Sequence, residues 1–169
     1  MITVTESGMT FGPFDERNLF KIEDSPFVRR LNGIKACEFV CWNGVTNQLV
    51  FIEAKSSVPN PRTSPEQFES YFIEMLEKFD NALQVLVTGV LSRSDVLAEE
   101  LEDGIAQTDW SQAGILFYLV IPEAPLEVLG SLTEKLRKVM HRQIRVWRAN
   151  AFVINRHLAY RKGIATANI

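Results

Sequence analysis

A continuous apolar run, residues 114–121, constrains the fold of this chain more than any other part of its sequence. The run stops at Pro122. Strands that are buried on both faces have uninterrupted sequences of this kind, because other layers of the protein cover both sides of their sheet. The run therefore predicts a strand inside a sheet that is covered on both faces.

Two other strongly apolar segments, residues 35–42 and 48–55, are expected to form neighbouring strands. Asn43-Gly44 begins the connection between them, and this dipeptide is a strong signal for a β-hairpin. The connection continues to about Asn47, so the predicted turn is longer than two residues. The sequence thus predicts an antiparallel hairpin in the first half of the chain.

The register of this hairpin decides which side chains meet. If its loop is centred between residues 45 and 46, Val40 faces Phe51 and Glu38 faces Glu53, with Cβ atoms about 4.5–5.5 Å apart. Because side chains alternate along a strand, Lys55 projects from the same face as both glutamates. The opposite face suits a core and carries Cys37, Phe39, Cys41, Val50, Ile52 and Ala54.

The rest of the chain alternates between predicted helices and strands. Apolar residues at spacings of three and four predict a long amphipathic helix over residues 65–91, with Ser64 as N-cap, Pro65 in the first turn and Gln67 completing a capping box. The whole order predicts an α/β fold, a mixed central β-sheet flanked by helices. Weaker patterns predict short strands within residues 1–24, a turn or short helix at 25–30, helices at 94–101 and 126–140, and strands at 143–146 and 152–154.

Length and charge bear on the domain organisation. The 169 residues, 46% hydrophobic and 23% charged, favour a single globular domain over residues 1–169. The net charge of −3 hides an asymmetry, because residues 135–169 contain nine of the 18 Lys and Arg residues and no Asp or Glu. This basic C-terminal segment either meets an anionic partner or packs against acidic helices of the protein itself.

The sequence gives two indications of the compartment. Cys37 and Cys41 lie four residues apart on a predicted strand, about 13 Å, which is too far for a disulfide and favours buried thiols in a reducing environment. The first residues lack the basic and apolar regions of a secretory signal, and no apolar stretch reaches the roughly 18 residues of a membrane span. A cytoplasmic protein without a membrane segment is the expectation.

Glu38, Glu53 and Lys55 are the strongest candidates for a functional site. Two opposed carboxylates destabilise a hairpin unless something compensates them, and a divalent cation is the natural compensator. A lysine beside them can orient an attacking water or stabilise charge that develops on a phosphate. The alternative is a glutamate–lysine salt bridge at an exposed hairpin end, without a catalytic role.

Residues 34–57 carry a resemblance to a known family. Their sequence, from Ile-Lys-Ala-Cys-Glu-Phe-Val to Ile-Glu-Ala-Lys-Ser-Ser, resembles the second and third motifs of the PD-(D/E)XK, or restriction-endonuclease-like, nucleases. The following helix and apolar strand resemble the rest of that core, so the similarity extends over residues 18–121. Members hold Mg²⁺ or Mn²⁺ with the acidic pair and hydrolyse phosphodiester bonds in DNA or RNA.

The resemblance assigns expected roles to individual residues. It implies a restriction-endonuclease-like core in which Glu38 and Glu53 are catalytic metal ligands and Lys55 is the catalytic lysine. Family members often carry a further glutamate before the hairpin, for which Glu16 and Glu23 are the candidates. The family also contains noncatalytic scaffolds, so the alternative function is a nuclease-fold subunit that binds protein or nucleic acid within a larger complex.

The expected partners follow from the basic segment and from the size of the chain. Arginines interleaved with aromatic residues can hold phosphates and stack on bases. Such a pattern makes four arginines candidates for nucleic-acid contacts. A domain with few spare loops for recognition is also expected to act as a homo-oligomer or with a partner subunit. The four candidates are Arg145, Arg148, Arg156 and Arg161.

Overall fold

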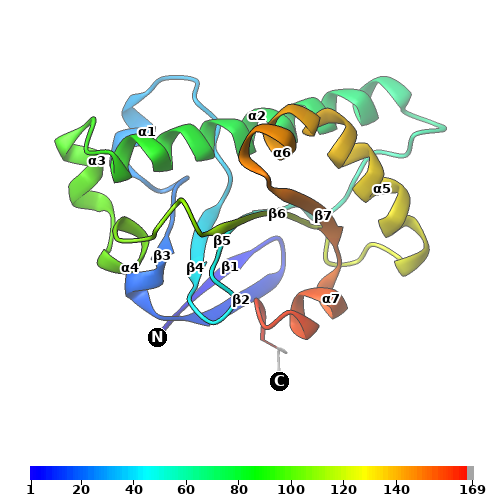
Figure 1. Ribbon diagram of the computed structural model, residues 1–169. Coiled ribbons are helices and arrows are strands. Elements are labelled where there is room, and N and C mark those ends of the chain that lie inside the picture. The colour runs from blue at the N-terminus through cyan, green and yellow to red at the C-terminus, as the bar shows by residue number, and fades with distance from the viewer. Residues whose placement is uncertain (167–169) are drawn as a thin grey trace.

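A five-stranded mixed sheet forms the centre of the protein, in a computed structural model that describes residues 1–166 (Figure 1). The first three strands pair antiparallel and the last two pair in parallel with their neighbours. The predicted mixed α/β arrangement is therefore confirmed. In spatial order the strands are β3 (Leu19–Phe20), β4 (Phe39–Asn43), β5 (Gln48–Ala54), β6 (Gly114–Val120) and β7 (Asn150–Ile154).

Helices cover one face of this sheet. The long helix α2 crosses the upper side of Figure 1, with α5 and α6 beside it. Phe117 of β6 lies between two other rings, 5.1 Å from Phe51 and 5.3 Å from Phe79 between centroids. Of the helices in residues 1–166, none combines the length and hydrophobicity needed to cross a membrane. The helices on this face of the sheet are α2 (Pro65–Val90), α5 (Leu126–Val139) and α6 (His141–Trp147).

A hairpin and a short helix cover the opposite face. The hairpin consists of β1 (Ile2–Glu6) and β2 (Met9–Phe14), and α7 (Arg156–Arg161) lies next to it. Its Phe11 ring packs edge-on against Phe39 of β4 at 5.4 Å. Both faces of the central strands are therefore buried, which confirms the prediction made from the apolar run at 114–121.

Small elements close the remaining side of the molecule. A 3₁₀ turn η1 precedes β3, α1 follows β3, and α3 and α4 follow the long helix. Gly104 brings α4 against η1, because a Cβ atom there would lie only 2.0 Å from the Asn18 side chain. The bounds are η1 (Glu16–Asn18), α1 (Pro26–Arg30), α3 (Asp95–Glu100) and α4 (Asp103–Ala106).

The β4–β5 hairpin has the predicted register. Val40 pairs with Phe51, and the last pair toward the candidate site is Phe39 with Ile52. The prediction that residues 35–38 belong to the strand is wrong, because the chain bends at Glu38 before β4 begins. The bend turns Cys37 into the helical side of the core instead of the predicted opposite side.

Several local predictions also need correction. Residues 143–146 form part of helix α6 and not a strand, since four alternating residues are too few to separate the two periodicities. Ser64 precedes Pro65 at the start of α2, but its side chain makes no capping hydrogen bond. The last strand begins at Asn150, earlier than predicted, and helix α7 after it was not predicted. Cys37 and Cys41 are free and buried, as predicted.

Candidate active site

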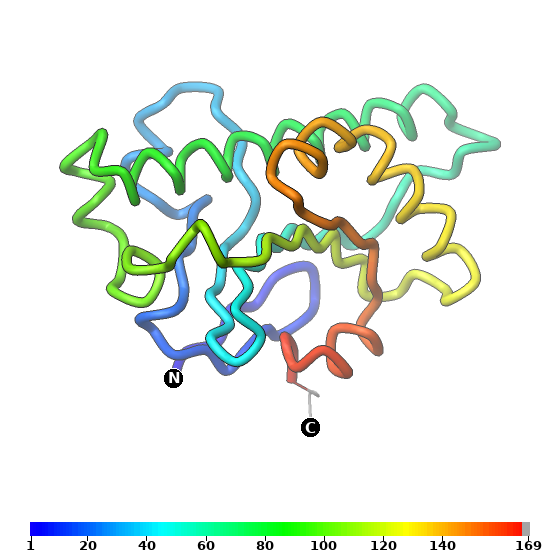
Figure 2. Tube along the Cα trace, in the orientation of Figure 1, coloured from blue at the N-terminus to red at the C-terminus, as the bar shows by residue number. Residues whose placement is uncertain are grey.

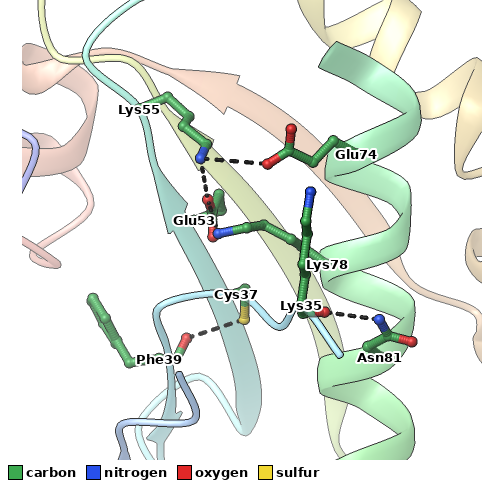
Figure 3. Close-up of polar contacts among 8 residues, drawn as sticks. All are labelled: Lys35, Cys37, Phe39, Glu53, Lys55, Glu74, Lys78 and Asn81. Carbon is green, nitrogen blue, oxygen red and sulfur yellow. Dashed lines mark hydrogen bonds and ion pairs between the residues drawn. The ribbon is translucent and has the colours of Figure 1, made fainter. Parts of the chain in front are cut away.

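A buried carboxylate at the end of β5 organises the candidate site. The side chain of Glu53 faces α2 and is 0% exposed. Its Oε1 atom accepts a hydrogen bond from Lys78 Nζ of α2 at 2.7 Å, and Lys55 Nζ lies 3.2 Å from the same oxygen (Figure 3). Two ammonium groups from different elements therefore meet one carboxylate oxygen.

Lys55 connects this buried carboxylate with the surface. Its backbone N–H donates to Val120 O at 2.9 Å, which continues the pairing of β5 with β6 for one more residue. Its side chain is 29% exposed and also lies 3.8 Å from Glu74 of α2. The backbone of Lys55 is thus fixed by the sheet, and its ammonium group lies between a buried acid and an exposed one.

The charges of this group balance one another. Burial raises the pKa of Glu53, whereas the ammonium groups of Lys78 and Lys55 act in the opposite direction. Burial is the largest influence on the pKa of Lys78 and lowers it, but the charge and hydrogen bond of Glu53, together with the charges of Glu23 and Glu38, make the net shift upward. We therefore describe Glu53 and Lys78 as a buried ion pair, which requires both partners. The second oxygen of Glu53, Oε2, is buried and has no hydrogen-bond partner.

Glu38 lies in a different environment, next to Glu23. The pKa of Glu38 is raised to about 9, first by burial, then by a hydrogen bond with Glu23 and by the negative charge of Glu53. The same hydrogen bond lowers the pKa of Glu23. The two carboxyl groups therefore share one proton at neutral pH.

Two hollows open beside these acids, and Glu23 lines both. The larger, of about 420 Å³, lies between α1, the segment 31–36 and α2, and its wall includes Glu74 and Lys78. We call it the α1–α2 cleft. The smaller, of about 130 Å³, lies against β1 and includes Glu38. Lys78, the lysine of the buried ion pair, therefore lines the α1–α2 cleft.

The donor set suits the divalent cation that the motif resemblance implies. Hard cations such as Mg²⁺ prefer carboxylate oxygens, and Glu53 Oε2 is a buried carboxylate oxygen without a partner. The proton on Glu38 occupies a place that a cation can take when the proton leaves. Within residues 1–166, however, no three His, Cys, Asp or Glu side chains are already gathered as a metal site.

The structure brings some of the predicted site residues together and separates others. Lys55 lies beside Glu53, as the shared face predicted. Glu38 does not face Glu53 in the ladder, because it lies one residue beyond the last pair, and its carbonyl accepts a hydrogen bond from Glu23 N at 3.4 Å. Of the two candidate auxiliary acids, Glu23 contacts Glu38, whereas Glu16 lies exposed in η1.

The four arginines proposed to contact nucleic acid do not form one surface. Arg145 lies in α6 and Arg148 directly follows it, on the face that α2 also covers (Figure 1). Arg156 and Arg161 lie in α7 on the other face, and Arg156 is paired with Glu123 at 2.6 Å. The basic segment is therefore split between contacts within the protein and exposed side chains.

Sequence reasoning missed Lys78, which forms the buried ion pair of the site. It falls within the apolar stripe of α2, three residues after Met75 and next to Phe79, both of which are buried. A lysine on the buried side of a helix needs an acidic partner, because an unpaired buried charge is very costly. The position of Lys78 within the apolar stripe of α2 was therefore the available signal that it is paired, and its partner is Glu53 at the end of β5.

Comparisons with protein families, with curated proteins and with solved structures find no match to this chain. The interpretation of the site therefore depends on the geometry of its residues and on the motif resemblance of residues 34–57. Neither the fold nor the carboxylates alone define an activity.

Proposed function

We propose that the protein is a metal-dependent nuclease with a restriction-endonuclease-like core, which hydrolyses phosphodiester bonds in DNA or RNA. One observation carries this proposal. At the end of β5, Glu53 keeps one oxygen without a partner while Lys55, two residues on, reaches its other oxygen. A carboxylate with an unpartnered oxygen and an adjacent, partly exposed lysine are the two groups that such hydrolysis needs.

Each residue has a proposed role. Glu38 and Glu53 would hold Mg²⁺ or Mn²⁺, and Glu23 would act as the auxiliary acid that controls the protonation of Glu38. A bound divalent cation supplies Lewis-acid polarisation of the phosphate and lowers the pKa of a water. Lys55 orients the attacking water and offsets negative charge on the phosphate in the transition state.

The topology around the site supports the proposed core. The antiparallel strands β4 and β5 lead into helix α2, and the chain then returns as β6, parallel to β5. The loop from residue 56 to 64 connects the site to the start of α2, as Figure 2 shows at the right of the view. Because most of the chain forms the central sheet and the elements that cover its two faces, we propose that substrate recognition involves a second copy or a partner subunit.

Lys78 favours a second candidate function, a noncatalytic nuclease-fold subunit that binds protein or nucleic acid in a larger complex. Its ammonium group bonds Glu53 Oε1 at 2.7 Å and its side chain is almost fully buried. The charge of Glu53 is therefore compensated without a metal ion. A protein that had lost catalysis would retain such a pair for stability alone.

Cleavage assays separate the two candidates. Wild-type protein is incubated with single- and double-stranded DNA and RNA in Mg²⁺ or Mn²⁺, alongside Glu53→Gln and Lys55→Gln. We expect metal-dependent cleavage that falls by about 10²–10³-fold or more in each variant, the usual effect of removing one group that stabilises a transition state. Circular dichroism spectra and melting curves establish that each variant is folded.

Glu77→Gln is the matched control, since Glu77 is an exposed acid of α2 outside the site. It removes the same charge and should cleave like the wild type. Cleavage that persists in both Glu53→Gln and Lys55→Gln would remove these residues from the catalytic site. No wild-type cleavage of any substrate would favour the noncatalytic subunit.

A further inference from the structure

The α1–α2 cleft contains a lysine that is fixed at its backbone and free at its side chain. The carbonyl of Lys35 accepts a hydrogen bond from Asn81 Nδ2 of α2 at 2.8 Å, and the next two residues are buried. The backbone at Lys35 is thus attached to α2 even though it belongs to no helix or strand. Its side chain is exposed and extends along α2 toward Lys78 and Glu74 (Figure 3).

The other cations around the cleft already have carboxylate partners. Arg29 pairs with Asp24 at 2.6 Å. Lys78 and Lys55 both meet Glu53, as described above. Among residues 1–166, no carboxylate lies within ion-pair distance of Lys35, although it lines the same cleft. Lys35 therefore supplies the cleft's uncommitted positive charge.

An anionic strand in this cleft lies against two acids, Glu23 and Glu74, and Lys55 lies 3.8 Å from Glu74. Their negative charge repels phosphates, so a compensating cation is needed along the path. Lys35 lines the same cleft as Glu23, Glu74 and Lys78, and its side chain extends toward Lys78 and Glu74 (Figure 3). We propose that Lys35 binds a backbone phosphate of the nucleic-acid substrate adjacent to the bond held at Glu53 and Lys55, an inference that rests on the proposed function.

The salt dependence of binding tests this contact. Fluorescence anisotropy measures the binding of fluorescein-labelled single-stranded DNA, duplex DNA and single-stranded RNA, with Ca²⁺ replacing Mg²⁺ so that binding is measured without cleavage. A lysine that neutralises one phosphate contributes about 0.9 to the slope of log K against log salt for duplex DNA and about 0.7 for a single strand. We expect Lys35→Gln to weaken binding several-fold and to lower the slope by about that amount.

Two further variants make the result specific. Lys35→Arg keeps the charge and should retain the wild-type slope. Arg93→Gln removes an equal charge from an exposed arginine beyond the end of α2, remote from the cleft, and should leave affinity and slope unchanged. A Lys35→Gln variant that behaves like the wild type, an Arg93→Gln variant that loses as much, or a wild-type protein that binds none of the probes would each overturn the proposal.

The binding assay also keeps this inference separable from the nuclease proposal. A protein that binds nucleic acid through Lys35 but never cleaves it would refute catalysis and support the contact. A protein that cleaves with an unchanged salt slope in Lys35→Gln would support catalysis and refute the contact.

Discussion

The two glutamates at the end of the β4–β5 hairpin are held in opposite ways. Glu53 is 0% exposed and is neutralised by ammonium groups of the protein itself. Glu38 is only partly buried, next to Glu23, and is neutralised by a proton, since its pKa is raised to about 9. One hairpin end therefore contains a carboxylate compensated by lysines and a carboxyl group neutralised by a proton.

This difference separates structure from function at the site. The lysine partners of Glu53 are fixed by α2 and β5, so the ion pair forms together with the fold. The proton on Glu38 exchanges with solvent, and a cation can replace it. In the proposed nuclease, Glu53 would contribute mainly through its fixed position, whereas Glu38 would lose its proton on binding a metal ion.

The largest expected effect comes from removing the buried partner of Glu53. Lys78→Met leaves a buried carboxylate with only the partly exposed Lys55, and breaking a buried pair costs about 3–5 kcal/mol of unfolding free energy. Chemical denaturation followed by circular dichroism measures this loss. Lys55→Met is the matched control and should cost less than Lys78→Met, because the Lys55 side chain is 29% exposed and that of Lys78 only 8%.

A double variant sharpens the same test. Glu53→Gln combined with Lys78→Met removes both charges. The double variant should therefore lose less unfolding free energy than the sum of the losses of the two single variants. Additive losses would contradict the ion pair. Equal losses for Lys78→Met and Lys55→Met would show that the two lysines do not differ in burial as the structure indicates.

The next effect is a pH dependence caused by Glu38. Its pKa is about 9 in the folded protein against the ordinary value of 4.5, so the folded state binds its proton more tightly. This contribution to stability is complete below about pH 4.5 and is lost as the pH rises toward about 9. After allowance for solvent screening at a partly exposed group, we expect a loss on the order of 1 kcal/mol.

Glu38→Gln tests this dependence, because glutamine cannot ionise. The variant should lose less stability than the wild type between about pH 5 and about pH 8 when unfolding free energies are compared. Glu77→Gln, on the exposed side of α2, should keep the wild-type dependence. Parallel curves for wild type and Glu38→Gln would mean that Glu38 is ionised in the folded protein.

The sequence allowed Glu53 to be placed better than Glu38. The alternation of β5 and the register of its pairing follow from local patterns, so the positions of Glu53 and Lys55 could be predicted. The bend at Glu38 depends on contacts with the segment around Glu23, which is distant in sequence and has no regular pattern. A prediction from local alternation extended strand β4 past its true start at Phe39, and so placed Glu38 opposite Glu53 instead of next to Glu23.

The same contrast applies to the fold as a whole. The apolar run at 114–121 and the periodicity of α2 each identify an element, because burial of a whole face leaves a regular sequence pattern. Helix α6 buries little, so its four ambiguous residues favoured a strand. Lys78 was overlooked although it interrupts a regular apolar stripe, because its partner lies 25 residues earlier, on a different element.

A smaller effect is expected at Tyr71, near the Glu53 end of the site. Its hydroxyl is buried without a hydrogen-bond partner, and burial first, then the charges of Glu53 and Glu74, raises its pKa. Tyr71→Phe removes this unpartnered group, so the unfolding free energy should change by less than about 1 kcal/mol, in either direction. Thermal melts of the wild type and the variant, with and without Mn²⁺, measure this change in unfolding free energy. A loss above about 2 kcal/mol would show that the hydroxyl has a partner that the contacts do not include.

The smallest effect is expected from the outer partner of Lys55. Glu74 is 38% exposed and lies 3.8 Å from Lys55 Nζ, longer than the 3.2 Å that separates this nitrogen from Glu53. Exposed pairs of this kind contribute between about 0 and 1 kcal/mol, so Glu74→Gln should cost no more than about 0.5 kcal/mol in chemical denaturation. A larger loss than that of Lys55→Met would mean that Glu74 stabilises the fold through contacts other than its ion pair with Lys55.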